Sequence, residues 1–196
     1  IDDPRAKKFL LNREALVSQR VLQEEFAKVF AKCWIYVGHA SEIRRPGAFV
    51  TRKVAGRPVI FCRDAEGEVR CFFNTCRHRG AIVCTEREGS ARSFRCVYHG
   101  WTYRNDGQLV GVPGADAYAE SFDKIALGLK SPARVEAYRD FWFLCLDAGA
   151  PSLADYLGRA RDSIDLVLDQ SPSGQMELVA GVQEYDVQAN WKLMVE

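Results

Sequence analysis

Two short segments of this 196-residue chain constrain its fold more than any other feature, because each carries one cysteine and one histidine within four positions. They read NTCRHRG at residues 74–80 and RCVYHGW at residues 95–101. Only three histidines occur in the chain, and two of them lie in these segments. Thiolate and imidazole are both good metal ligands. A fold that brings the two segments together would therefore offer two of each to a metal centre.

The spacing within the pairs indicates which centre they suit. One residue separates Cys76 from His78, two separate Cys96 from His99, and seventeen lie between the pairs. Two cysteines and two histidines can also build a tetrahedral zinc site, but common zinc spacings place like ligands together. A 2Fe-2S cluster with one iron on two cysteines and the other on two histidines requires one ligand of each kind from each loop. We predict such a cluster here, since histidines lying by chance near unrelated cysteines would have to produce this spacing twice.

Five neighbouring residues are expected to surround the cluster: Arg79, Gly80, Tyr98, Gly100 and Trp101. Glycine allows the backbone to approach the sulfides, so that N–H groups can point at them. Such hydrogen bonds stabilise the reduced, more negative cluster. The two aromatic rings can wall off the histidine-bound iron from water, or they can simply pack in the core.

The other cysteines and the third histidine have a structural interpretation. Seven cysteines are an odd number, and the N-terminus shows no export signal, so a disulfide framework is not expected. The cysteines outside the pairs lie beside aromatic or aliphatic residues or far from any histidine, which is typical of small buried hydrophobes. They are Cys33, Cys62, Cys71, Cys84 and Cys145. His39 stands alone and is expected to be a structural histidine with satisfied hydrogen bonds.

Composition and charge argue against several classes of partner. Lysine and arginine total 27 against 26 aspartate and glutamate residues, and the net charge of +1 provides no field to attract nucleic acid or an anionic membrane. No apolar run approaches the roughly 20 residues that span a bilayer. We therefore expect a cytoplasmic protein without nucleic acid or membrane partners. The 47% hydrophobic content is sufficient for a core.

The predicted fold class is mainly β. Short segments rich in aromatic and β-branched residues, separated by Gly- or Pro-containing breaks, predict antiparallel strands. They are residues 34–39, 48–54, 58–63, 69–74, 93–97, 101–112, 133–147 and 176–187, with hairpin bends at 105–107 and 138–140. Helical periodicity predicts an N-terminal helix at 19–33 capped by Ser18, a second helix at 152–168, and a helix start at 188–196 capped by Asn190. Residues 111–121 are expected to form a long loop that covers a neighbouring surface.

The segments CRHRG and CVYHGW resemble those of the Rieske proteins. The resemblance implies that Cys76 and Cys96 bind one iron and that His78 and His99 bind the other. The respiratory-complex branch of that family carries two further cysteines, which form a disulfide, at positions that hold Ala81 and Tyr98 in this chain. The chain therefore resembles the other branch, the oxygenases and their ferredoxins, which work at the lower end of a range of roughly −150 to +300 mV.

A longer resemblance extends from the N-terminal helix and CWIYVGHASEI to the last residues, NWKLMVE. These segments are similar to the start of the large (α) subunit of aromatic-ring-hydroxylating dioxygenases. The resemblance implies an N-terminal helical segment at 1–36 and a Rieske-type, ISP-like antiparallel β domain at 37–150. Residues 151–196 would hold a connecting helix, a strand and the first turn of an α+β catalytic domain whose remainder is absent.

By the same resemblance the complete subunit is an oxidoreductase. Electrons from NAD(P)H pass through a reductase, and in some systems a ferredoxin, to the Rieske cluster and then to a mononuclear non-haem Fe(II). That iron activates O₂ for attack on an aromatic substrate, which gives a cis-dihydrodiol. The family assembles as α3 or, with a small β subunit, as α3β3.

This stretch alone would only transfer electrons, because the residues that bind the second iron, and with them the catalytic residues, lie outside it. The alternatives are a stand-alone Rieske electron carrier and a Rieske monooxygenase or demethylase. The sequence leaves open the aromatic substrate, the regiochemistry, the redox partner and the presence of a β subunit.

Overall fold

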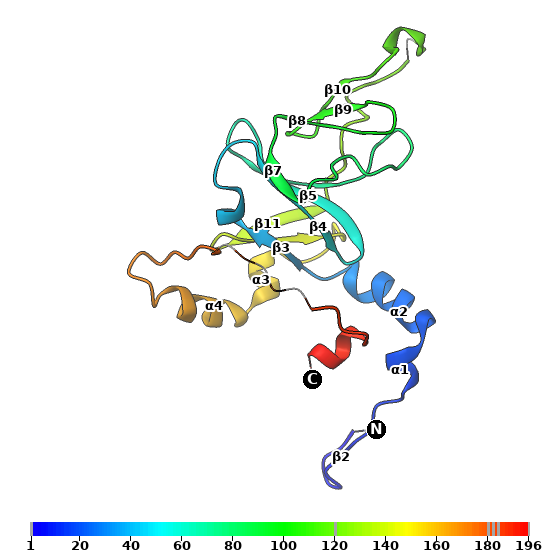
Figure 1. The fold of residues 1–196 in the computed structure, drawn as a ribbon. Helices are drawn as coiled ribbons and strands as arrows, with labels where there is room; N and C mark the ends of the chain where they lie inside the picture. Colours follow the sequence, from blue (N-terminus) through cyan, green and yellow to red (C-terminus); the bar gives the residue numbers. More distant parts are fainter. Residues whose placement is uncertain (1, 120, 180, 182, 184, 196) are drawn as a thin grey trace.

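The computed structural model describes residues 2–119, 121–179, 181, 183 and 185–195. Its architecture is mainly antiparallel β (Figure 1). A four-stranded sheet has the order β6-β5-β4-β7, two three-stranded sheets have the orders β11-β12-β3 and β10-β9-β8, and β1 pairs with β2. The mainly β fold class predicted from the sequence is confirmed.

The strands are short, as the spacing of the Gly- and Pro-containing breaks predicts. Their bounds are β1 Asp2–Asp3, β2 Lys8–Phe9, β3 Ile35–His39, β4 Ala48–Val54, β5 Arg57–Arg63, β6 Val69–Phe73, β7 Glu88–Ser90, β8 Ser93–Arg95, β9 Thr102–Arg104, β10 Leu109–Gly111, β11 Arg134–Tyr138 and β12 Phe141–Cys145. Seven of the predicted strand segments coincide with these strands, whereas β1, β2 and β7 were not predicted.

Helices and helical turns make up the rest of the regular structure. The α-helices are α1 Glu14–Val17, α2 Gln19–Glu25, α3 Leu153–Leu157 and α4 Ala160–Leu168, a π-helix η1 spans Phe26–Phe30, and 3-10 turns are η2 Ala40–Ile43, η3 Ala115–Ala117 and η4 Trp191–Met194. Among the described residues, no helix is both long enough and apolar enough to cross a bilayer.

The central strand β5 divides the core in two. Side chains alternate between the two faces of a strand. Ile60 and Cys62 pack in the core cluster that contains the two candidate cysteine ligands, whereas Val59 and Phe61 pack against the sheet β11-β12-β3. All four are fully buried. One face of the four-stranded sheet therefore supports the two loops that carry the candidate cysteine ligands, and the other face packs on the rest of the chain.

Both predicted hairpin bends are present. Arg139 and Asp140, between β11 and β12, have φ values of 50° and 68°, and positive φ at both central residues is typical of a two-residue hairpin turn. Gly107, between β9 and β10, has φ +91°, and a Cβ there would approach the Phe72 ring to 2.5 Å. This turn therefore requires glycine for both its backbone conformation and its close packing.

The predicted helices at 19–33 and 152–168 form, but the first ends in a π-helix and the second is broken in two. The Ser18 hydroxyl caps α2 by accepting from the N–H of Val21 at 3.4 Å, and the helix continues through η1, where Ala31 N donates to the carbonyl of Phe26. The single helix predicted at 152–168 is wrong, because Gly158 adopts φ +48° and ends α3 before α4 begins.

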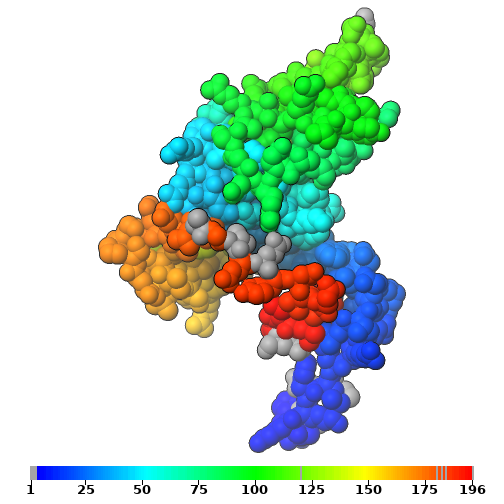
Figure 2. Space-filling model, viewed as in Figure 1, coloured from blue at the N-terminus to red at the C-terminus, as the bar shows by residue number. Residues whose placement is uncertain are grey.

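The C-terminal region departs most from the prediction. The described residues of 176–187 form no strand, so that prediction is wrong there; residues 180, 182 and 184 lie outside the described residues. Val179 and Tyr185 are 81% and 79% exposed, so these apolar side chains face no buried sheet surface. The predicted helix start is a 3-10 turn, in which Asn190 caps by accepting from Lys192 N at 3.1 Å. Figure 2 shows this last segment lying against the N-terminal helical region.

Candidate metal centre

The first loop, between β6 and β7, closes on itself immediately after Cys76. The N–H of Gly80 donates to the carbonyl of Cys76 at 2.9 Å, and the N–H of Cys76 donates to the carbonyl of Ala81 at 2.7 Å. The backbone at Gly80 has φ +76°, a conformation that glycine adopts without steric cost. The side chains of residues 76 and 78 are thereby presented from one compact turn.

The second loop, between β8 and β9, repeats this construction. Gly100 N donates to the carbonyl of Cys96 at 2.9 Å, and Cys96 N donates to the carbonyl of Trp101 at 2.8 Å. The φ of Gly100 is +71°, and a Cβ there would lie 3.1 Å from Pro113. The two Cys-to-Gly segments are thus the same turn made twice, which explains why each pair is followed by glycine.

A buried asparagine holds the first loop in place. The side-chain oxygen of Asn74 accepts from the N–H groups of Val83 and Cys84 at 3.0 and 2.9 Å, and its amide donates to the carbonyl of Cys84 at 2.7 Å. Asn74 is 3% exposed, so these three bonds satisfy backbone groups that water does not reach. The loop is therefore positioned by a side chain as well as by its own backbone.

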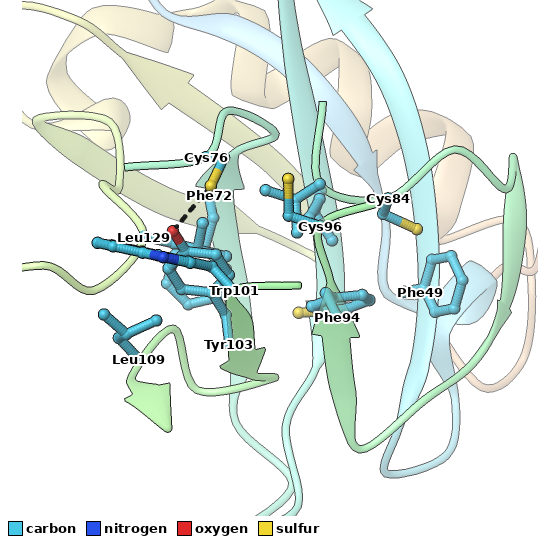
Figure 3. Packing of buried hydrophobic residues seen from close by; sticks show 13 residues of the cluster. Phe49, Phe72, Cys76, Cys84, Phe94, Cys96, Trp101, Tyr103, Leu109 and Leu129 are labelled. Carbon is cyan, nitrogen blue, oxygen red and sulfur yellow. Dashed lines mark hydrogen bonds between the residues drawn. The ribbon is translucent and has the colours of Figure 1, made fainter. Parts of the chain in front are cut away.

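The two candidate cysteine ligands lie inside a hydrophobic cluster. Cys76 and Cys96 are 5% and 2% exposed, and neither is in a disulfide. Figure 3 shows them among aromatic and aliphatic side chains of this cluster, with Tyr103 bonded to Cys76. Burial of the thiols keeps water away and restricts access to whatever they bind.

Tyr103 donates a hydrogen bond to the first of these cysteines. Its hydroxyl oxygen lies 3.2 Å from Cys76 Sγ, the contact dashed in Figure 3. The same oxygen accepts from the N–H of Arg77 at 3.0 Å, so its own proton is free to point at the sulfur. Burial, and then the bond to Cys76, raise the pKa of Tyr103. The phenol therefore stays protonated and acts as the donor.

The two candidate histidine ligands face one another. The ring centroids of His78 and His99 are 4.7 Å apart at an interplanar angle of 68°, and both residues are half-buried. His78 also stacks on Trp101 at 4.9 Å and 6°. Burial first, and then the charges of His99 and Arg79, lower the pKa of His78. Its imidazole is therefore neutral at pH 7, which is the form that binds metals.

The residues present fit a 2Fe-2S cluster with mixed ligands. The Nδ1 atom of His78 is buried and has no hydrogen-bond partner, so it lacks the partner that a buried imidazole nitrogen normally has. Among the described residues, no three His, Cys, Asp or Glu side chains gather as ligands of one metal ion. A cluster that takes two protein ligands per iron needs only pairs. Two buried thiols and two facing imidazoles are such pairs, so these four residues could hold it.

The five residues expected around the cluster differ in their surroundings. Gly80 and Gly100 form the turns, and Trp101, 3% exposed, packs on His78. Tyr98 is 61% exposed and does not form a buried wall, although its ring centroid lies 3.8 Å from that of His99. Arg79 is exposed.

Sequence reasoning missed one residue of the site and predicted the covering loop correctly. Tyr103 was not singled out. It is the middle residue of the strand Thr102–Arg104 and the only buried one of the three, and its place between two polar residues is the sequence signal that could have marked it as inward-facing. The long loop at 111–121 does cover a surface: Tyr118 lies 6.5 Å from the Trp101 ring, and Phe122, just beyond the loop, lies 5.9 Å from it. Residue 120 lies outside the described residues.

Four of the remaining cysteines, Cys62, Cys71, Cys84 and Cys145, are buried as expected, whereas Cys33 is only half-buried. Burial raises the pKa of Cys62 and of Cys71 to about 12 and, with help from Glu86, that of Cys84 to about 11. These thiols are therefore neutral hydrophobes at pH 7. His39 is 2% exposed, and its Nδ1 lies 2.9 Å from the hydroxyl of Ser41.

Comparison with known proteins places this geometry in a family. The model of the Rieske [2Fe-2S] domain matches residues 33–133. The large subunit of anthranilate 1,2-dioxygenase from Acinetobacter baylyi is 39% identical over 96% of this chain and 40% of its own length. The α subunit of an N,N-dimethyl phenylurea N-demethylase from Sphingobium is 37% identical over 95% of this chain and 41% of its own length.

Solved structures agree. Naphthalene 1,2-dioxygenase from Rhodococcus superposes with a TM-score of 0.84 at 40% identity, covering 89% of this chain and 40% of that one. A quaternary ammonium Rieske monooxygenase superposes with a TM-score of 0.70 at 33% identity over 78% of this chain and 44% of that one. The chain thus spans about 40% of the length of the curated relatives it matches. Since the family model covers more than half of the sequence and includes both cysteine and histidine loops, the chain belongs to the Rieske [2Fe-2S] domain family.

Proposed function

We propose that Cys76 and Cys96 bind one iron of a 2Fe-2S cluster and that His78 and His99 bind the other. The observation that carries this proposal is the pairing itself: two buried thiols and two facing imidazoles come from two loops with the same hydrogen-bonded turn. When bound, such a cluster supplies one-electron redox chemistry. The chain would contribute the burial, the Tyr103 hydrogen bond to Cys76 and the stacking of Trp101 on His78.

We further propose that the chain is the Rieske part of the large subunit of an aromatic-ring-hydroxylating dioxygenase. The names of the relatives support this, as does the length they share with this chain. Electrons from NAD(P)H would arrive through a reductase, with or without a ferredoxin. They would continue to a mononuclear non-haem iron held by residues outside this sequence. In this proposal the substrate is an aromatic compound and the product a cis-dihydrodiol.

The proposed division of the chain follows from the same reasoning. Residues 1–36 are the helical entry, residues 37–150 the Rieske domain, and residues 151–196 the connection to the catalytic domain. In support, Trp191 donates to Glu25 at 2.9 Å and packs on Phe30 at 5.1 Å. The assembly we propose is α3, or α3β3 with a small β subunit.

The electron would leave through the histidine edge of the cluster. Beside His99, Val97 and Tyr98 are 78% and 61% exposed, an apolar and aromatic surface suited to contact with another subunit. The second nitrogen of each imidazole could donate to a carboxylate across that contact, which would couple reduction to protonation.

A monooxygenase or demethylase is the second candidate. One relative is an N-demethylase α subunit, and one similar structure is a Rieske monooxygenase. The chain is therefore similar to enzymes that are not ring dioxygenases as well as to ring dioxygenases. The stand-alone carrier is less well supported, because the relatives are more than twice as long as this chain.

One experiment separates these functions. The full-length protein, loaded with iron and sulfide, is given NADH, a reductase and a panel of aromatic acids and hydrocarbons, and products are identified by mass spectrometry. Incorporation of both atoms of ¹⁸O₂ into a dihydrodiol supports the dioxygenase. One ¹⁸O atom in a phenol supports the monooxygenase, as does conversion of an N-methyl compound added to the panel into its demethylated amine and formaldehyde, in which case the inserted oxygen leaves with the formaldehyde. A reducible cluster without any product supports the carrier.

A further inference from the structure

A small pocket lies beside the first metal loop, away from the histidines. Its volume is about 210 Å³, and its lining includes Arg57, Phe73, Cys76, Arg77 and Lys130. The shallow pocket at His99 is lined instead by residues 95–100 and Pro113. The two pockets share no lining residue, so the cluster loops present two separate recesses.

The pocket beside Cys76 is positively charged and has no acidic lining residue. Three of its lining residues are cationic: Arg57, Arg77 and Lys130. Within the described part of the chain, none of the three forms a salt bridge, unlike Arg52, Arg70 and Arg104, which pair with carboxylates. The Nε atom of Arg77 is buried and has no hydrogen-bond partner. A buried donor without an acceptor is rare, and an incoming anion would supply one.

One of the cations is held in place, and the backbone of another is fixed. The guanidinium of Arg57 lies over the Phe73 ring at 5.7 Å. The carbonyl of Lys130 accepts from Phe73 N at 2.8 Å, which fixes the backbone of the lysine beside that ring. Arg57 and Lys130 are both exposed. They can therefore meet a partner's surface, while Arg77 lies deeper.

The pocket is connected to the proposed cluster by short contacts. Cys76 is one of its walls, and Arg77 donates its N–H to the Tyr103 hydroxyl that in turn bonds Cys76 Sγ. A group bound in the pocket would lie next to the cysteine-bound iron. The histidine edge would remain uncovered for transfer to the catalytic iron.

We propose that this pocket receives an acidic side chain of the protein that donates electrons to the cluster. The inference rests on the proposed function, because it assigns one partner to the same centre. Three cations with no internal carboxylate complement an acidic surface, and such complementarity speeds and orients encounter. One electron leaves the redox centre of the donor, which is oxidised, and reduces the cluster by one electron; no bond forms or breaks.

The test is a stopped-flow measurement of electron transfer to the cluster-loaded full-length protein. The probe donor is a reduced, acidic plant-type 2Fe-2S ferredoxin, whose potential of roughly −400 mV is low enough to reduce a Rieske cluster. The double variant Arg57→Gln, Lys130→Gln is compared with wild type at low and high potassium chloride. We expect the second-order rate constant of the variant to fall about five- to tenfold at low salt, with most of the salt dependence lost.

Two controls make the outcome decisive. Arg159→Gln removes one positive charge, against two in the double variant, from a side chain that is 99% exposed and lies between α3 and α4, and it should keep the wild-type rate. Dithionite is a small reductant that needs no docking site, so it should reduce the cluster of every variant at the same rate. A variant whose cluster dithionite does not reduce would count against the proposed cluster rather than against the pocket. The proposal would be overturned if the ferredoxin reduced the double variant as fast as it reduces Arg159→Gln. That result is also the one expected if the pocket binds only free anions.

Discussion

Replacing Tyr103 with phenylalanine would remove one hydroxyl and leave the ring in place. The side chain is fully buried in the cluster that contains Cys76 and Cys96, so phenylalanine keeps the packing. The lost oxygen lies 3.2 Å from Cys76 Sγ and 3.0 Å from Arg77 N. The variant therefore isolates the contribution of one hydrogen bond to the proposed cluster.

The expected effect is a lower reduction potential. A hydrogen bond to a charged acceptor contributes about 1.5–3 kcal/mol, and the bond is stronger when the cluster is reduced and more negative. Only the difference between the two oxidation states changes the potential. A difference of about 1–2 kcal/mol corresponds to about 40–90 mV, since a tenfold change in equilibrium constant is about 59 mV for one electron. The potential of Tyr103→Phe should fall by this amount.

The assay is a spectroelectrochemical titration of the cluster-loaded protein at fixed pH and salt. Tyr118→Phe is the matched control, because Tyr118 also packs near Trp101 but has no hydrogen bond to a thiol among the described residues. Its potential should equal that of wild type. If Tyr103→Phe retained a full cluster with an unchanged potential, the assignment of Tyr103 as a donor to a cluster ligand would be refuted.

Three further predictions concern the ligands and the scaffold. His78→Cys should keep an iron-sulfur cluster but lower its potential by a few hundred millivolts, toward the plant-type value of roughly −400 mV; an unchanged potential in a cluster-containing variant contradicts the ligand assignment. Asn74→Ala leaves two buried N–H groups and one carbonyl without their side-chain partner, so urea denaturation should show a loss of about 2–4 kcal/mol, whereas the exposed Arg159→Ala should cost almost nothing. The hydrogen bonds from Lys192 and Trp191 lower the pKa of Glu25 below its ordinary value of 4.5. Because a lowered pKa stabilises the fold above the unfolded value and loses that contribution as pH falls through the folded value, the melting temperature of wild type should drop more steeply below pH 4.5 than that of Glu25→Gln, and parallel curves would exclude the contact.

The sheets were predictable because their signals are local. Short runs rich in aromatic and β-branched residues, bounded by Gly- or Pro-containing breaks, mark β4, β5 and β6 without knowledge of their partners. The same kind of signal misled at 176–187, because composition indicates an extended segment but not whether a neighbouring strand exists to pair with it. Helical periodicity likewise did not reveal the break at Gly158, since the apolar spacing continues across it.

The site was predictable in its four metal-binding candidates but not in what surrounds them. Those four residues are marked by spacing within two loops. The bond from Tyr103 to Cys76 joins residues 27 positions apart and depends on how β8 pairs with β9. The basic pocket depends on the antiparallel pairing of β5 and β6, which places Arg57 and Phe73 near one another at the ends of their strands.

The most direct test of the metal centre is pulsed EPR of the reduced protein with ¹⁵N-labelled histidine. Binding of one iron by His78 and His99 predicts couplings from two histidine nitrogens, one of which disappears in His78→Cys while the cluster remains. A reduced 2Fe-2S cluster without any histidine nitrogen coupling would contradict the assignment of these two residues as its ligands.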